Sequence, residues 1–144
     1  MNKLDVNKLI TALENDKNED IIKEDFKTIN KIKINAIKQL QLSENKTIDI
    51  YERLKYYKYV DEMPDMKYGS FIRWVNIRNP ENLKLSNGGI VCEIKVTENG
   101  IVVICKNKMN RCFQLNMSES LIFRKLTDQE LVLLSALNFI NNSR

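Results

Sequence analysis

Histidine is absent from this chain of 144 residues, glycine occurs only four times and proline only twice. Without histidine, no zinc site can combine Cys with His ligands, and no imidazole can activate a serine or cysteine nucleophile. The scarcity of Gly and Pro excludes long flexible linkers. Cysteine occurs three times, an odd number, and no CxxC pair is present. We therefore expect reduced thiols, no bound metal and a cytoplasmic location.

Phosphate-binding loops of the GxGxxG or P-loop type are also absent, because Gly88-Gly89 is an isolated pair. No apolar run approaches the roughly 20 residues that a membrane helix needs. The first residues, Met1-Asn-Lys-Leu-Asp5, lack the apolar core of a signal peptide. These absences predict a soluble protein with no cofactor and no membrane partner.

Charge is distributed unevenly along the chain. Residues 1–66 carry 12 Lys and Arg against 13 Asp and Glu, a net charge of −1, whereas residues 67–144 carry 11 against 6, a net charge of +5. The same boundary separates a predicted helical N-terminal region, 1–66, from a strand-rich region with a C-terminal helix, 67–144. The basic excess of the strand-rich region permits a polyanionic partner.

The segment 90–105 is the clearest structural pattern, with two strands and a tight turn. Its alternation predicts one buried face, made of Ile90, Cys92, Ile94 and Val96. Asn99-Gly100 is typical of a type I′ turn, whose central residues have positive φ angles. That turn would place Val96 opposite Val103 and Ile94 opposite Cys105. A hairpin is marginal alone, so we expect further strands beside it.

Elements on both sides complete an α+β fold. Helices are predicted over 3–14, 19–42 and 48–62, the last with Thr47 as N-cap, and a polar loop over 14–20. Strands are predicted over 70–78, 83–85, 112–117 and 121–126. A capping box, Thr127 to Glu130, begins a last helix that ends near 141. Short strands joined by tight turns favour a small antiparallel barrel of SH3-like or OB-like type, covered by the C-terminal helix. An open sheet with helices on one face is the alternative.

One enzymatic pattern is present. Pro64-Asp65, followed by Glu93-Ile94-Lys95, resembles the PD-(D/E)xK motif of metal-dependent nucleases, in which two carboxylates bind Mg²⁺. A helix normally follows the second part of that motif, but here a turn leads into another strand. We therefore expect an exposed ion pair at Glu93 and Lys95, and carboxylates of Asp65 and Glu93 that do not converge.

Two groups of residues could bind nucleic acid. Aromatic and basic residues interleave over 51–59, but acidic neighbours favour an interpretation in which the tyrosines pack and their hydroxyls face water. The candidates in the strand-rich region are Arg73, Trp74, Arg78, Lys84, Lys106, Lys108, Arg111, Arg124 and Lys125. Trp74 is either a core residue or an exposed stacking platform, and its pattern does not separate the two.

Three strings in residues 67–130 carry a resemblance: Lys67-Tyr-Gly-Ser-Phe-Ile-Arg-Trp-Val75, Gly88-Gly-Ile90 and Ile122-Phe-Arg-Lys-Leu-Thr127. They look like small uncharacterised proteins of large nucleocytoplasmic DNA viruses, which share the high Asn, Lys and Ile content. The resemblance implies a viral protein of the virion or of viral factories in the host cytoplasm. It assigns no functional residue.

The sequence therefore predicts a non-enzymatic binding module whose basic small barrel contacts nucleic acid or a protein partner. The alternative is a structural or assembly protein that forms homo-oligomers through its apolar helices. A metal-dependent nuclease is the third hypothesis.

Overall fold

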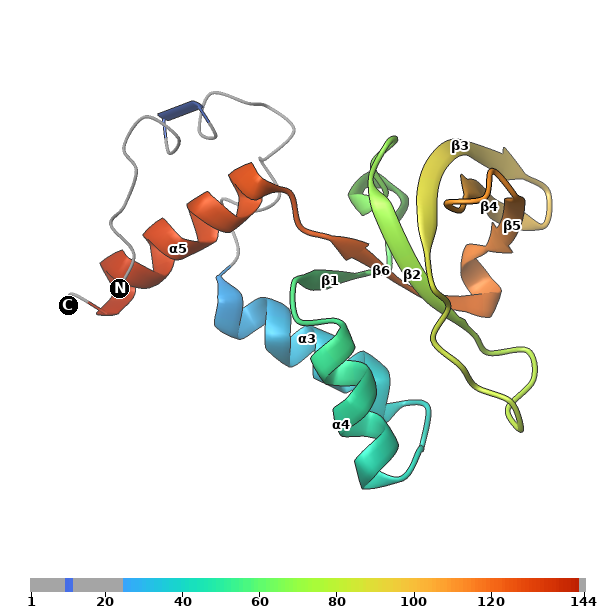
Figure 1. Cartoon of the computed structure of the whole chain (residues 1–144), viewed down its shortest axis with the longest axis horizontal. Coiled ribbons are helices and arrows are strands. Elements are labelled where there is room, and N and C mark those ends of the chain that lie inside the picture. Colours follow the sequence, from blue (N-terminus) through green and yellow to red (C-terminus); the bar gives the residue numbers. More distant parts are fainter. Residues whose placement is uncertain (1–9, 12–24, 143–144) are drawn as a thin grey trace. The chain divides into compact units, whose positions relative to one another are not determined.

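The computed structural model describes residues 10–11 and 25–142 and has a mixed α+β fold (Figure 1). Its helices are α3 (Phe26–Lys38), α4 (Glu44–Arg53), α5 (Asp128–Asn142) and the 3-10 helices η2 (Met63–Asp65) and η3 (Met117–Glu119). Its strands are β1 (Tyr57–Val60), β2 (Phe71–Asn76), β3 (Gly89–Thr97), β4 (Gly100–Lys106), β5 (Cys112–Asn116) and β6 (Ser120–Lys125). The predicted helix 3–14 and loop 14–20 lie outside the described residues, except that Ile10 and Thr11 are helical.

The chain divides into two compact units. In the first, α5 packs against the start of α3 through a buried cluster made of Ile29, Leu126, Leu133 and Leu134. The predicted capping box is confirmed: the Thr127 amide donates to Glu130 Oε1 over 3.0 Å, and the Glu130 amide donates to Thr127 Oγ1 over 3.1 Å. These reciprocal bonds satisfy amides at the start of α5 that have no partner within the helix. A position of α5 over the sheet stays a prediction.

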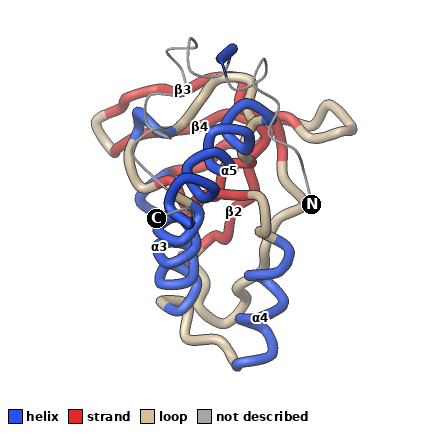
Figure 2. Tube along the Cα trace, turned by 90° about the vertical axis from the view of Figure 1, so that its left-hand side faces the viewer, coloured by secondary structure: helices blue, strands red, loops and turns tan. Residues whose placement is uncertain are grey.

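The second unit, Lys33–Lys125, contains a six-stranded antiparallel sheet in the order β1-β6-β2-β3-β4-β5. Figure 2 distinguishes its strands from the helices by colour. The sheet does not close into the barrel that the sequence favoured, because β1 and β5 are edge strands that do not pair with each other. A likeness to the SH3 or OB type stays a prediction. These edge strands have only four and five residues. The sheet is open, as in the alternative considered for the sequence.

Both faces of the sheet carry buried clusters. On one, Val75 and Phe123 pack with Ile37 of α3 and with Leu54, the residue that follows α4. On the other, Trp74 packs with Val103, Leu115 and their neighbours, and only 8% of Trp74 is exposed. The Trp74 and Phe113 rings have centroids 5.9 Å apart, although β2 and β5 are three places apart in the strand order. The sheet must therefore curl around this second cluster.

The central hairpin forms, but its turn and register differ from the prediction. Thr97 pairs with Gly100, Val96 with Ile101 and Ile94 with Val103. The turn residues are thus Glu98 and Asn99. Among described residues, positive φ angles occur at Gly100 but not at Asn99, so the predicted type I′ turn is wrong. The Thr97 hydroxyl donates to the Gly100 carbonyl and accepts from the Asn99 amide, which closes this turn with a side chain.

A β-bulge explains why the predicted buried face of β3 is wrong. The register shifts between Val91 and Glu93, so Cys92 is an extra residue in the strand. Val91 is consequently buried, whereas Ile90 and Cys92 are exposed and Ile94 is half-buried. Val96 lies near the hairpin end and is 73% exposed. The predicted burial of Val103 and Cys105 on β4 is confirmed.

The predicted helix 48–62 is also corrected. Helix α4 begins earlier, after Ser43, whose side chain accepts a hydrogen bond from the Lys46 amide over 3.3 Å. It ends at Arg53, and residues 57–60 form β1, which pairs with β6. Thr47 is therefore not the N-cap. The aromatic and β-branched content of Tyr57-Lys-Tyr-Val60 suits a strand, and its pairing with a distant segment outweighs the local helical period.

Gly88 and Gly89 mark a close approach between strands. A Cβ added at Gly88, whose φ is +97°, would lie 2.7 Å from the Ile72 carbonyl oxygen. One added at Gly89 would lie 2.9 Å from the Lys106 carbonyl oxygen. These two positions let β3 pass tightly between β2 and the end of β4.

The remaining predicted strands agree with β2, β5 and β6, while 83–85 contributes only an isolated bridge between Val75 and Leu85.

Candidate nucleic-acid interface

The turn between β4 and β5 is built by one asparagine side chain. Asn107 Oδ1 accepts hydrogen bonds from the Met109 amide over 2.9 Å and from the Arg111 amide over 3.0 Å. The Asn107 amide donates to the Arg111 carbonyl, and Asn110 has a φ of +60°. Asn tolerates this left-handed conformation well. We call residues 106–111 the basic hairpin tip, and these bonds fix its backbone.

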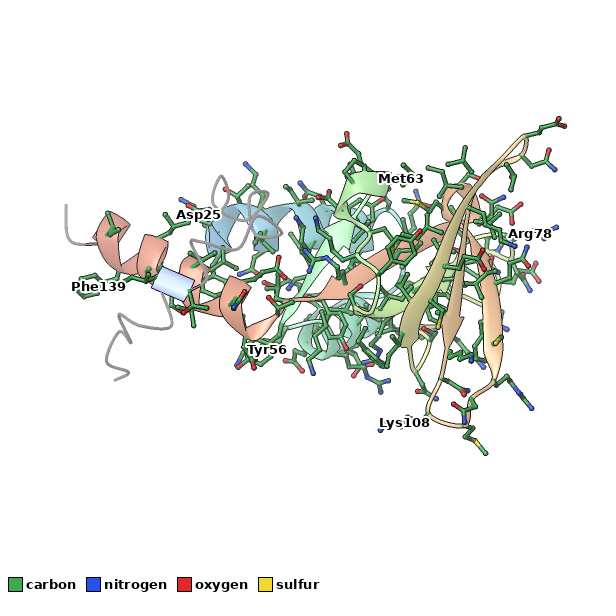
Figure 3. All side chains as sticks on the ribbon, turned by 90° about the horizontal axis from the view of Figure 1, so that it is seen from above. Asp25, Tyr56, Met63, Arg78, Lys108 and Phe139 are labelled. Carbon is green, nitrogen blue, oxygen red and sulfur yellow. The ribbon has the colours of Figure 1, made fainter. Side chains whose placement is uncertain are left out.

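The basic hairpin tip presents positive charge and one apolar side chain. Lys106, Lys108 and Arg111 are exposed, and no hydrogen bond or ion pair joins their side chains to other described residues. Met109 is 87% exposed. Figure 3 shows Lys108 at the far end of the hairpin. The sequence contains no Asp or Glu from 99 to 118, so the local field is positive.

Such a tip suits a phosphate backbone. Lys and Arg side chains neutralise phosphates without any need for a pocket, and the guanidinium of Arg111 can contact a phosphate with two nitrogens. An exposed apolar side chain among these cations can lie against a base or between two bases. The tip therefore has the chemistry of a small polyanion contact.

Three of the nine predicted binding residues are held inside the second unit instead. Trp74 belongs to the core, which settles the alternative left open by the sequence. Arg124 is buried, and its Nε donates to the Asp65 carbonyl over 3.0 Å. Arg73 is half-buried, and its Nε donates to the Ser86 carbonyl over 2.8 Å. All three side chains contribute to packing between segments of the unit.

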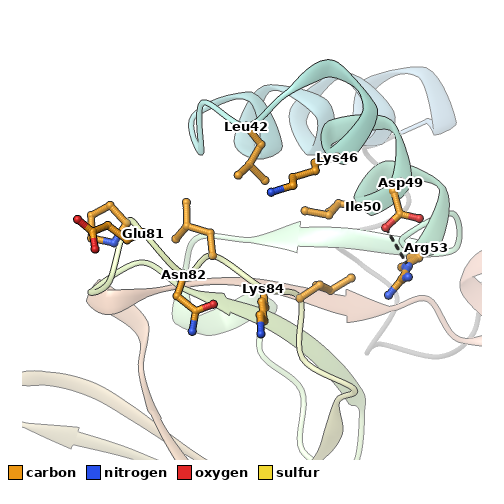
Figure 4. A pocket seen from close by; sticks show the side chains of 11 residues that line it. Leu42, Lys46, Asp49, Ile50, Arg53, Glu81, Asn82 and Lys84 are labelled. Carbon is orange, nitrogen blue, oxygen red and sulfur yellow. Dashed lines mark ion pairs between the residues drawn. The ribbon is translucent and has the colours of Figure 1, made fainter.

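The other three predicted residues are exposed but are not part of the tip. Arg78 forms an ion pair with Glu119, with 3.7 Å between its Nη1 and a carboxylate oxygen. Lys125 is exposed at the end of β6. Lys84 lines a cleft of about 410 Å³ between α4 and the loop 80–85. In Figure 4, Lys84 and Lys46 lie on different sides of this cleft, and Asp49 pairs with Arg53 at 3.2 Å. Positive and negative side chains mix there, so the cleft does not single out an anionic ligand.

The tyrosines of residues 51–59 mostly pack within the second unit, as the sequence analysis favoured, and do not form a base-stacking surface. Tyr57 is buried, and the Tyr59 ring lies 5.6 Å from the Phe123 ring, centroid to centroid. Burial raises the pKa of both phenols. Tyr56 is exposed, with the Lys55 ammonium 5.4 Å from its ring centroid. One exposed ring does not make a stacking surface for successive bases.

The carboxylates of the nuclease-like pattern have different partners. Asp65 lies 3.8 Å from the ammonium of Lys58, and Glu93 lies 3.7 Å from that of Lys95. Glu93 and Lys95 are both exposed, as expected for an ion pair on a strand face. Within the described ranges, no group of three or more His, Cys, Asp or Glu side chains is placed to hold a metal ion.

Lys33 is a buried cation that the sequence analysis did not identify. Its ammonium donates to the carbonyls of Leu54, Lys55 and Tyr57 over 2.8, 3.3 and 3.0 Å and lies 5.4 Å from the Tyr51 ring centroid. Only 1% of the residue is exposed, and this burial lowers its pKa to about 8. The ammonium caps the end of α4, where backbone carbonyls have no partner within the helix. Its position in the apolar series Ile29, Lys33, Ile37 was a signal of burial.

The tip residues missed by sequence analysis are Met109 and Asn107. An isolated methionine in a polar turn, preceded by an asparagine that can accept from the backbone, was the available signal.

No helix in the described part of the chain is long and apolar enough to cross a membrane. The chain matches no protein-family model, and no curated protein or solved structure is significantly similar to it.

Proposed function

We propose that this chain is a non-enzymatic nucleic-acid-binding module and that the basic hairpin tip is its contact. The observation that carries the proposal is the convergence of three exposed cations and one exposed methionine on an acid-poor hairpin turn that four hydrogen bonds hold in place. The second unit as a whole supports it, since residues 33–125 contain 16 Lys and Arg against 10 Asp and Glu.

The expected mode of binding is through the backbone, without strong sequence preference. On duplex DNA, three phosphate contacts give a log–log salt slope of about −2.7, so affinity should fall roughly 40-fold between 50 and 200 mM salt. Single-stranded or locally opened nucleic acid suits Met109 better than a regular duplex, because an unstacked base exposes its face to an apolar side chain. The tip reads charge and base exposure rather than base edges.

A charge-matched comparison tests the proposal. The tip variant carries Lys106→Glu, Lys108→Glu and Arg111→Glu. The control carries Lys38→Glu, Lys84→Glu and Lys125→Glu, which change the net charge equally at exposed positions away from the tip. Fluorescence anisotropy measures the affinity of the tip variant and of the control for labelled single- and double-stranded DNA and RNA at two salt concentrations. Binding should be abolished in the tip variant and only reduced in the control. Equal losses would mean that the net charge alone attracts nucleic acid.

Substitutions of Met109 distinguish the role of this exposed side chain from that of the cations. Met109→Ala should weaken binding to single strands about three- to tenfold and leave the salt slope unchanged, because it removes contact with a base but no charge. Met109→Leu is the matched control and should retain most of the affinity. If Met109→Ala changed only the slope of log affinity against log salt concentration, the result would contradict a contact between Met109 and a base.

Assembly is the second candidate function. It is favoured by two exposed apolar residues near the end of α5, Phe139 and Ile140. Self-association through apolar helices should be insensitive to salt, unlike phosphate binding. The resemblance to proteins of large DNA viruses supports either role in a virion or a viral factory of the host cytoplasm. Mg²⁺-dependent cleavage in the same titrations, lost in Glu93→Ala, would instead support the nuclease hypothesis.

A further inference from the structure

The two edges of the sheet differ in how they are protected against pairing with another strand. At β1, Lys58 points into the unit, is buried and lies 3.8 Å from Asp65. Asp61 and Glu62 follow the strand directly. An inward-pointing charge and flanking charges are common devices that prevent an edge strand from pairing. The β1 edge is therefore protected.

The β5 strand itself carries no charge, and the one charged residue that flanks it directly is Arg111. The strand reads Cys112-Phe-Gln-Leu-Asn116, followed by Met117 and Ser118, without a charged residue or a proline. Cys112 and Gln114 are exposed, while Phe113 is only half-buried although it belongs to the second cluster. An uncharged edge with an incompletely covered aromatic residue is suited to accepting another strand.

The backbone groups available at this edge follow from the pairing with β4. The Asn107 amide donates to the Arg111 carbonyl, which makes these two residues a hydrogen-bonded pair. Bonded and non-bonded pairs alternate in an antiparallel ladder. Cys105 and Phe113 are consequently the next bonded pair, and Val103 and Leu115 the one after. Cys112, Gln114 and Asn116 therefore direct their N–H and C=O groups away from β4, toward the open edge.

We propose that this edge binds a second copy of the chain, β5 against β5, antiparallel and centred on Gln114. In this register Gln114 lies opposite the partner's Gln114, and Cys112 lies opposite the partner's Asn116. The three outward residues of each copy then give about six backbone hydrogen bonds. The result is one continuous sheet across the two protomers.

Charge and burial favour a second copy over an unrelated strand. The nearest charged residue, Arg111, would lie opposite the partner's Met117, so no like charges face each other. Phe113 would lie beside the partner's Leu115 on the core side, where it loses its remaining exposure to water. The pairing uses neither the side chains of the basic hairpin tip nor the apolar surface of α5. It can therefore fail or hold independently of nucleic-acid binding.

Proline at the centre of the edge is the sharpest test. Gln114→Pro removes an N–H that points away from β4, so the ladder within the protomer keeps its bonds. Gln114→Thr is the matched control, because it keeps the N–H and suits a strand. Sedimentation of the full chain over a wide concentration range should show a dimer for the wild type and for Gln114→Thr. Gln114→Pro should weaken it by about 30-fold, as each copy loses one central donor.

Disulfide trapping decides the matter if Gln114→Pro fails to fold. With Cys92 and Cys112 replaced by Ser, Gln114→Cys should cross-link two chains rapidly under mild oxidation, because facing Cα atoms of a bonded pair are about 5.5 Å apart. Lys95→Cys in the same background, an exposed position on β3, should cross-link slowly. A wild-type monomer at all concentrations overturns the proposal. So does a dimer in which Cys at 114 cross-links no faster than Cys at 95.

Discussion

Replacing Lys33 by methionine removes the buried ammonium and keeps a side chain of similar length and volume. Three backbone carbonyls then lose a charged donor. The Leu54 carbonyl keeps a partner, because it also accepts from the Tyr57 amide over 3.0 Å. The carbonyls of Lys55 and Tyr57 therefore account for most of the expected effect, at the point where α4 ends and β1 begins.

The magnitude follows from those carbonyls. A buried acceptor left without a donor costs about 1–3 kcal/mol, and loss of a charged donor lies toward the upper end. Removal of a buried charge offsets part of this cost. We expect Lys33→Met to lower the free energy of unfolding by about 2–4 kcal/mol at pH 7, measured by urea denaturation. Lys38→Met, on the exposed side of the same helix, is the control and should change it by less than about 0.5 kcal/mol.

The pH dependence has a definite sign. Burial lowers the pKa of Lys33 to about 8 from 10.5, so between these values the unfolded chain binds more protons than the folded one. The wild type should therefore gain stability relative to Lys33→Met as pH rises from 8 to 10.5, and lose that gain as pH falls through 8. Taking the difference between the two proteins cancels the titration of tyrosines and cysteines.

Two results would refute this reasoning. Equal stability of Lys33→Met and wild type at pH 7 would mean that the carbonyls at the end of α4 do not depend on the ammonium. A stability difference that stays constant up to pH 10 would mean that the three carbonyls hold the proton strongly enough to outweigh desolvation.

Further predictions concern the core, the thiols and the capping box. Val103→Ala, at a fully buried position, should lower the free energy of unfolding by about 1–3 kcal/mol in the same assay. Cys92 and Cys112 should react with a bulky disulfide reagent in the folded protein, whereas Cys105 should stay protected, since burial raises the pKa of its thiol to about 11; rapid reaction of all three would contradict the assigned strand faces. Thr127→Ala should destabilise the protein by about 1 kcal/mol, and Thr127→Ser should restore most of that loss.

Sequence patterns predicted the elements whose signals are local. Alternation located β2, β5 and β6, and the reciprocal groups of Thr127 and Glu130 located the start of α5. Strand β1 was missed because Leu54 and Tyr57 continue the helical period of α4, while its pairing partner β6 lies about 60 residues away. The bulge at Cys92 was missed for a related reason: one extra residue is invisible in an alternating string, yet it changes the face of every residue after it.

The candidate site was predicted in part. Lys106, Lys108 and Arg111 belong to one hairpin, so a local prediction of the turn already brings them together. Trp74 and Arg124 belong to strands that are covered on both faces, where alternation does not indicate exposure. Lys33 is the reverse case, since its charge suggested exposure and its position on the helix indicated burial.

The place of β6 has a consequence for how the chain is made. This strand is the last to be synthesised, yet it lies between β1 and β2, the first two. On the ribosome, β1 has no strand to pair with and β2 has one open edge until residues 120–125 emerge. The meander β3–β4–β5 can form earlier from contacts close in sequence, whereas closure of the sheet must wait for the most distant ones. A nascent chain that stalls before residue 120 would therefore expose two apolar strands at once, and it would be a target for chaperones or aggregation until the last strand arrives.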